Sequence, residues 1–204
     1  MKKRTDTGLP LLFQHLKGIW LNPTFELKRI SGYDNFRNYL KWIIIYIILI
    51  EILNIIFLYF IPPLAQIPEV NLSPKFINFQ RYSKIFTLIF WPTMYFAGGF
   101  ITNWLCQKAK AKNKINNILI STAVLGLATN FPLYLLSTIF PKLNNLIFTV
   151  IYYSVSFWIY YLSVLNISFI YSITKKLALG VFLLTMIVGG IISFLTMSLL
   201  LYVS

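Results

Sequence analysis

From Trp42 to the C-terminus, long apolar stretches alternate with short polar segments. A helix needs about 20 residues to cross a hydrocarbon core about 30 Å thick, and five of the stretches reach that length. Lipid offers no partner to a free backbone N–H or C=O group, so these stretches are expected to be helices. The pattern predicts an all-α, polytopic transmembrane bundle over residues 42–204, with spans at about 42–61, 83–106, 115–140, 146–173 and 177–203.

Proline marks the breaks between the first spans. Pro62 and Pro63 follow the first span and cannot continue its helix. We expect the Pro-punctuated segment 61–81 to connect the first two spans. Pro92 lies inside the second span, where it is expected to produce a bend.

Residues 1–41 form a cytoplasmic head of different character, amphipathic and basic. Apolar side chains share one face at helical spacing, which predicts an interfacial helix through Leu12, Phe13, Leu16, Ile19 and Trp20. Asn22 followed by Pro23 is typical of a helix start and predicts a second short helix over residues 24–30. Contacts with anionic lipid headgroups are expected for the basic residues Lys17, Lys28, Arg29, Arg37 and Lys41. The head is either a plain membrane anchor or a docking surface for a cytosolic protein.

The composition excludes an ordinary soluble domain. Hydrophobic residues make up 58% of the chain and charged residues 11%, against about a quarter charged in soluble proteins. The formal net charge of +13 comes from Lys and Arg that cluster between the apolar stretches. That distribution indicates cytoplasmic loops beside anionic lipid, so membrane lipids are the expected partners and nucleic acid is not.

The chain lacks the residue patterns of common enzymes. It has one Cys and one His, and no HExxH, GxSxG or GxxxxGK[ST] sequence occurs. We therefore expect no metal site, no cofactor and no catalytic activity.

Glu51 is the exception among the apolar stretches. It lies about 14 Å along a helix from Trp42, near the middle of the hydrocarbon core, where an acid is costly unless it faces the bundle interior. Hydroxyl groups that could reach it belong to Thr129, Ser154, Ser156 and Ser163. The candidate intramembrane polar site comprises Glu51, Asn54, Asn103, Asn130 and Asn166. These groups either hold helices together or line a cavity for a lipid headgroup or a proton.

Four segments resemble the Yip family (Ypt-interacting proteins). They are residues 16–25 before the first span, 96–100 in the second, 127–135 in the third, and 158–165 in the fourth, which runs on to the basic turn 174–178. The resemblance implies a cytoplasmic N-terminus followed by five spans. Eukaryotic members act in early secretory traffic and associate with small Rab-class GTPases. The head of this chain lacks a long acidic or proline-rich region, so GTPase binding is not expected.

The leading hypothesis is therefore a non-enzymatic, Yip-like membrane protein that organises membranes or partner proteins, with a membrane-protein partner or an oligomer expected. The alternative is a small transporter or lipid-handling protein that uses a polar cavity around Glu51. The bacterial inner membrane is the favoured location, and the endoplasmic reticulum or Golgi is the alternative.

The distribution of Lys and Arg predicts the orientation. Eight precede the first span, four lie in residues 108–114 and two at residues 175–176, 14 in all, whereas the opposite side carries four. Because basic loops stay in the cytoplasm, we place the N-terminus there and the C-terminus outside.

Reporter fusions test this orientation. A reporter after Ser204 is expected to be active outside, and one inserted at Lys112 in the cytoplasm, because the basic loop does not translocate. The reverse pattern, or both reporters on one side, would contradict the topology.

Overall fold

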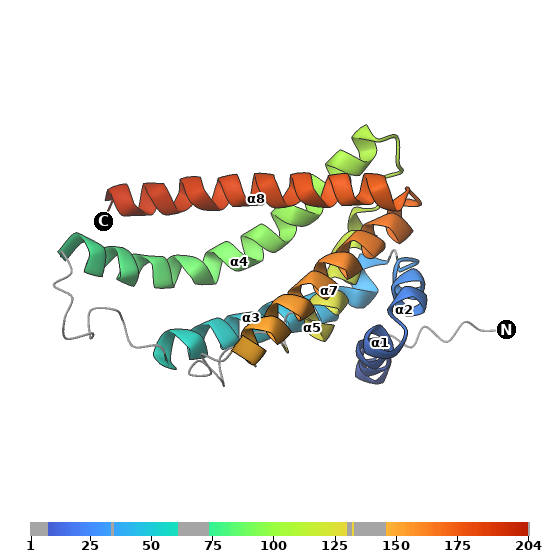
Figure 1. Cartoon of the computed structure of the whole chain (residues 1–204), viewed down its shortest axis with the longest axis horizontal. Coiled ribbons are helices and arrows are strands. Elements are labelled where there is room, and N and C mark those ends of the chain that lie inside the picture. The colour runs from blue at the N-terminus through green and yellow to red at the C-terminus, as the bar shows by residue number, and fades with distance from the viewer. Residues whose placement is uncertain (1–7, 34, 61–73, 130–131, 133–145, 204) are drawn as a thin grey trace.

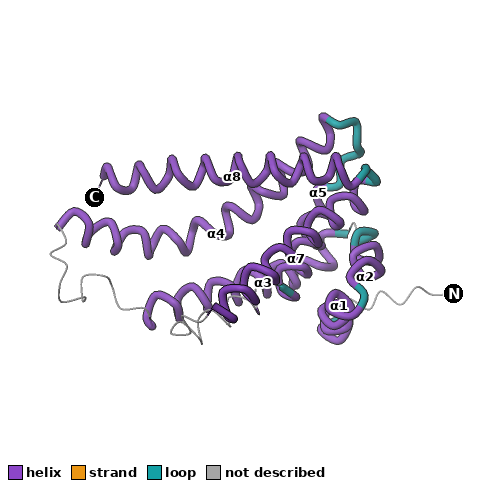
Figure 2. The backbone as a smooth tube through the Cα atoms, in the orientation of Figure 1, coloured by secondary structure: helices purple, strands orange, loops and turns teal. Residues whose placement is uncertain are grey.

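The structure is a computed structural model that describes residues 8–33, 35–60, 74–129, 132 and 146–203. Side chains are described for residues 8–33, 35–52, 90, 92–129, 132, 149–199 and 202. Within these ranges every regular element is a helix and none is a strand, as Figure 2 shows. The all-α class predicted from the sequence is therefore confirmed.

From α3 onward, the helices of the described residues alternate in direction between two ends of the molecule (Figure 1). They are α1 (Leu9–Leu21), α2 (Pro23–Ile30), α3 (Phe36–Phe60), α4 (Pro74–Lys108), α5 (Ile115–Ala128), α7 (Leu146–Tyr171) and α8 (Lys175–Val203). Four predicted spans fall within α3, α4, α7 and α8, apart from one or two residues at some ends. The third span is helical over α5, and most of residues 129–140 lies outside the described residues.

Two segments of the described chain are long and apolar enough to cross a membrane. They are Thr149–Tyr171 in α7 and Lys175–Leu199 in α8. The sequence predicted five spans. The two segments found are compatible with a membrane protein, but they do not establish the number of spans. At 14 residues, α5 is about 21 Å long, which is shorter than a hydrocarbon core of about 30 Å.

The second apolar helix is longer than predicted. α4 has 35 residues and begins at Pro74, so residues 74–81, predicted as part of a linker, are helical. Proline is favoured at the first position of a helix because the N–H group it lacks would have no intrahelical partner there. Pro92 lies inside α4, which curves along its length as predicted (Figure 1).

The core of the molecule forms around α5. Nearly every side chain from Asn117 to Ala128 is buried, and α5 packs against α1, α2, α3, α4 and α7. Its Ile120 and Val124 belong to one apolar cluster with Ile19 of α1 and Trp42 of α3. By contrast, α8 leaves most of its large apolar side chains exposed, which suits a helix that faces lipid.

The three basic segments of the chain meet at one end of the molecule. The Asn103 Oδ1 atom in α4 accepts hydrogen bonds from the backbone N–H of Lys114 and from the hydroxyl of Tyr171, each at 2.9 Å. Asn117 of α5 donates through Nδ2 to the Ser31 carbonyl at 3.0 Å. Together these bonds join the head, the basic loop and the turn before α8, opposite the end of α8 marked C in Figure 1.

The head contains two helices, α1 and α2, that pack against each other as a helical hairpin, and the second of them follows Asn22 as predicted. Asn22 caps α2 by accepting a hydrogen bond from the Phe25 N–H at 3.3 Å, and Pro23 takes the first helical position. In Figure 1, α1 is seen nearly end-on while α8 lies lengthwise, so α1 runs crosswise to the long helices. That direction suits a helix lying in the plane of a membrane surface.

The apolar face predicted for α1 is divided between two environments. Leu12 and Ile19 are buried against the bundle, whereas Phe13 and Trp20 are 65% and 50% exposed. The five residues share one side of the helix as predicted, but α1 packs on α5, so part of this side is buried in the bundle and only the rest is exposed. The other large apolar side chains of α1 and α2 that are exposed are those of Leu9, Leu21 and Phe25.

Gly18 allows α1 and α2 to pack closely against each other. A Cβ atom built at Gly18 would lie 2.1 Å from Glu26 Cγ, and the Glu26 carboxylate is fixed by a 2.7 Å hydrogen bond from His15 Nδ1. The side chain of Glu26 therefore cannot move away without losing this bond.

Overpacking usually costs about 1–3 kcal/mol, and alanine gains about 1 kcal/mol in helix propensity, so we expect Gly18→Ala to loosen the hairpin by up to about 2 kcal/mol. Limited proteolysis of the detergent-solubilised chain would measure this as faster cleavage of the head. Gly32→Ala is the control, since its Cβ would meet only the Arg29 carbonyl oxygen at an ordinary 3.5 Å. Equal protection of both variants would contradict the packing argument.

Candidate functional site

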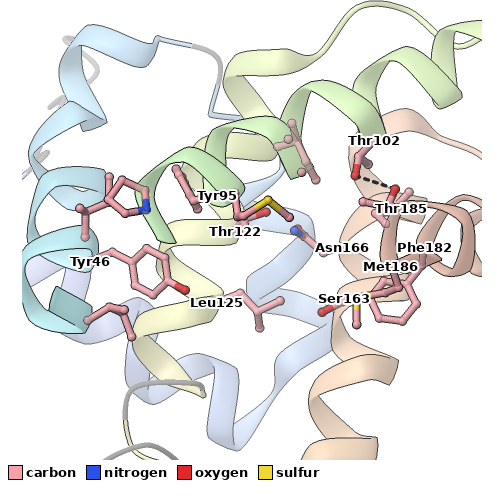
Figure 3. Close-up of a pocket in the computed structure, with 18 of the residues that line it drawn as sticks. Tyr46, Tyr95, Thr102, Thr122, Leu125, Ser163, Asn166, Phe182, Thr185 and Met186 are labelled. Atoms are coloured by element: carbon pink, nitrogen blue, oxygen red, sulfur yellow. Dashed lines mark hydrogen bonds between the residues drawn. The ribbon is translucent and has the colours of Figure 1, made fainter. Parts of the chain in front are cut away.

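A cavity of about 260 Å³ lies between the long helices and is lined by residues of α3, α4, α5, α7 and α8. Figure 3 shows side chains from these elements pointing toward one another around it. Most of the lining is apolar, and a few polar groups are placed among it, as in many small-molecule sites.

Helical periodicity brings each group of lining residues onto one face. Residues one, three or four positions apart recur on every helix, which is the spacing of a single helical face. The lining includes Tyr46, Ile47, Ile50 and Glu51 of α3, Pro92, Tyr95, Gly98, Gly99 and Thr102 of α4, Thr122 and Leu125 of α5, Ser163, Asn166 and Ile167 of α7, and Phe182, Thr185 and Met186 of α8.

Hydrogen bonds fix several of the polar groups in the lining. Thr102 and Thr185 join α4 to α8 through their hydroxyl oxygens at 3.2 Å (Figure 3). The Tyr95 hydroxyl donates to the Leu119 carbonyl, and the Tyr46 and Tyr95 rings have centroids 5.6 Å apart. These contacts connect α3, α4, α5 and α8 around the cavity.

Asn166 contributes a buried acceptor. Its Nδ2 donates to Ser121 Oγ at 3.0 Å, and Ser121 in turn donates to the Ile118 carbonyl at 3.2 Å. The Asn166 Oδ1 atom is buried and has no hydrogen-bond partner among the described residues. A buried acceptor without a partner is costly, and a ligand that donates a hydrogen bond would remove that cost.

The structure brings together two residues of the predicted polar site. Glu51 and Asn166 line the same cavity, and both Glu51 carboxylate oxygens are buried from solvent. Asn103 is elsewhere, joining α4 to Lys114 and Tyr171 as a packing residue. Asn130 and the side chain of Asn54 lie outside the described residues.

Of the predicted hydroxyl groups, only Ser163 lines this cavity in the described part of the chain. Thr129 is buried and donates to the Leu125 carbonyl, while Ser156 donates to the Tyr152 carbonyl on an exposed part of α7. The sequence reasoning missed Tyr46, Tyr95, Thr102, Thr122 and Thr185. Helical spacing could have found the α4 face, since Pro92, Tyr95, Gly99 and Thr102 recur every three or four residues.

The basic residues assigned to the membrane surface are all exposed. They are Lys17, Lys28, Arg29, Arg37 and Lys41. Arg29 also lies beside Glu26 of the same helix, with its Nη1 atom 3.6 Å from Glu26 Oε1. No group of three or more His, Cys, Asp or Glu side chains comes together within the described ranges.

A second polar cluster lies inside the head and was not predicted. His15 is fully buried, with its Nδ1 atom 2.7 Å from Glu26 Oε2 and its Nε2 atom 2.9 Å from the Tyr33 hydroxyl. Its ring also meets the Trp42 ring edge-on, with centroids 5.7 Å apart. The cluster joins α1, α2 and the start of α3, so it holds the head in place.

Burial lowers the pKa of His15 below 6.5, although the hydrogen bond and the charge of Glu26 oppose this and Arg29 adds to it. Burial likewise raises the pKa of Tyr33. At neutral pH, His15 is therefore uncharged. It donates through Nδ1 to the Glu26 carboxylate and accepts from the Tyr33 hydroxyl at Nε2.

Comparisons with protein-family models, with curated proteins and with solved structures give no match for this chain.

The head cluster predicts a dependence of stability on pH. Because the folded-state pKa of His15 lies below 6.5, the unfolded head binds more protons as the pH falls below that value. The stabilisation is thus present above pH 6.5 and is lost toward acid. Thermal unfolding and proteolysis between pH 7.5 and 5 should show a weaker head at low pH.

His15→Gln supplies the matched control, because its amide can donate to Glu26 and accept from Tyr33 but does not titrate. The acid-induced loss is expected to shrink in this variant. Identical pH profiles for both proteins would contradict the role of His15.

Proposed function

We propose that this chain is a non-enzymatic integral membrane protein that binds a small amphipathic molecule in the cavity around Glu51. The sequence favoured a protein that organises membranes, with this lipid-handling or transport role as the alternative. The observation that favours the alternative is the cavity of about 260 Å³, which a protein acting only through its surfaces does not need.

The placement of Glu51 adds to this argument. An acid in a membrane helix is costly, and such residues usually face a bundle interior and mark a pathway or a binding site. Glu51 meets that description, since it lines the same cavity as Asn166 in a largely apolar lining. Residues that served only to hold helices together would not need to border an open volume.

The five-span arrangement and the cytoplasmic N-terminus form part of the proposal. They are supported by the alternating directions of α3, α4, α5, α7 and α8 and by the meeting of the three basic segments at one end (Figure 1). Basic segments on one side favour the cytoplasmic face, and the bacterial inner membrane stays our favoured location.

A Yip-like organising role is the second candidate. The head favours it, because Phe13, Leu21 and Phe25 are more than half exposed on the hairpin that also carries exposed Lys28 and Arg29. Apolar side chains beside basic ones suit a surface that inserts among anionic headgroups. The proposed five-span order would also fit the Yip family, and a membrane-protein partner or an oligomer would fit this role.

Filling the cavity tests the proposed function. A Cβ atom at Gly98 meets nothing within 4 Å, and Gly98 borders the cavity, so Gly98→Leu should occupy it without a clash at Cβ. The amount of small molecules or lipids retained per protein after gentle purification, measured by native mass spectrometry, is expected to fall several-fold.

Gly190→Leu is the matched control. A Cβ at Gly190 also meets nothing within 4 Å, but this residue of α8 is outside the cavity lining. Both changes gain about 1 kcal/mol of helix propensity, so a difference between them reports on the cavity. If wild type and Gly98→Leu retain the same molecules in the same amounts, the proposed function is wrong.

A further inference from the structure

We propose that the ligand of this cavity carries an ammonium group on an apolar body, an inference that rests on the proposed function above. Three features of the lining lead to this class of molecule. They are its hydrogen-bond acceptors, its charge and its aromatic rings.

Two polar side chains of the lining, those of Glu51 and Asn166, offer hydrogen-bond acceptors to the cavity. Glu51 supplies a carboxylate, and Asn166 supplies the Oδ1 atom that has no partner among the described residues. A carboxylate accepts hydrogen bonds and donates none, and an amide oxygen likewise only accepts. An ammonium group has up to three N–H donors and no acceptor, so it can donate a hydrogen bond to an acceptor of either kind.

The charge of the lining points the same way. Among the described lining residues, Glu51 is the sole acid and neither Lys nor Arg occurs. Most of the basic residues that give the chain its charge of +13 lie in the head, in residues 108–114 and at residues 175–176. An anionic ligand would find no counter-charge in the described lining, whereas a cation would meet the Glu51 carboxylate in a setting of low dielectric constant.

Aromatic rings complete the setting for a cation. Tyr46 and Tyr95 line the cavity with centroids 5.6 Å apart, and Tyr46 comes from the same helix as Glu51. Ring faces attract ammonium groups, most strongly where water is excluded. The Tyr46 ring lies directly against α5. A Cβ atom built at Gly126 would be only 2.5 Å from this ring, so the glycine makes room for it.

The size of the cavity limits the ligand. Its volume of about 260 Å³ is just below the range of about 300–1,000 Å³ for pockets that take drug-sized molecules. A small lipophilic amine fits this space, and so does the amine headgroup of a phospholipid. Both candidate ligands carry an ammonium group attached to an apolar carbon chain or close to one.

Three probes of equal chain length separate charge from apolar burial. Hexylamine, hexanol and hexanoate would each be titrated into the full chain in detergent micelles by calorimetry, with Gly98→Leu as the baseline for partitioning into detergent. We expect hexylamine to bind at least about tenfold more tightly than hexanol, because a hydrogen bond to a charged group exceeds a neutral one by about that factor. Hexanoate should bind most weakly.

Glu51→Gln is expected to lower hexylamine affinity to the level of hexanol while leaving hexanol affinity unchanged. Glu51→Asp keeps the charge and should keep the preference for the amine. The wild-type comparison of the three probes decides the question even where a variant does not fold.

Nanodiscs distinguish a free amine from a lipid headgroup. Discs of phosphatidylglycerol with and without phosphatidylethanolamine would be compared for hexylamine binding. Competition by phosphatidylethanolamine supports an aminolipid as the ligand, and unchanged binding supports a soluble amine.

These measurements distinguish failure of the amine inference from failure of the proposed function. Equal wild-type binding of hexanol and hexylamine, with both lost in Gly98→Leu, would overturn the amine inference and leave the proposed function standing. If no probe distinguishes wild type from Gly98→Leu, the proposed function is itself overturned.

Discussion

The arrangement of the described helices depends on burying α5 on all sides. This helix is apolar and short, and it contacts α1, α2, α3, α4 and α7. Ile120, Ala123 and Val124 are fully buried, so truncation of any large side chain here would leave a cavity among five neighbours. The head is consequently part of the core, because α1 and α2 cover a side of α5 that would otherwise be open.

Packing around α5 also creates the candidate site. Lining residues of α3, α4 and α7 share the cavity with Thr122 and Leu125 of α5, and α8 closes it from another side. Gly99 allows α4 to approach α5, since a Cβ there would lie 2.6 Å from the Leu119 side chain. Nearby, the small residue Gly98 leaves open volume instead. Close contact and empty space thus come from adjacent glycines on one helix.

Buried polar groups in this molecule fall into two kinds. Asn103 and Asn117 bond to backbone groups at the basic end and fasten segments to one another, as does the His15 cluster within the head. Glu51 and Asn166 instead border a cavity. The distinction matters because a polar residue between packed helices stabilises the fold, whereas one that borders a space can also meet a ligand.

The sequence by itself determined the helical class, most of the long helices, the capped start of α2 and the place of Glu51 within an apolar helix. Apolar length, proline position and the cost of an acid in lipid are local properties that can be read along the chain. Tertiary structure decided which polar residues meet. It placed Asn166 with Glu51 and Asn103 elsewhere, turned half of the α1 apolar face inward, and buried His15 against Glu26 and Tyr33. Periodicity gives the spacing of a face but not its direction, because the direction depends on which helices pack together.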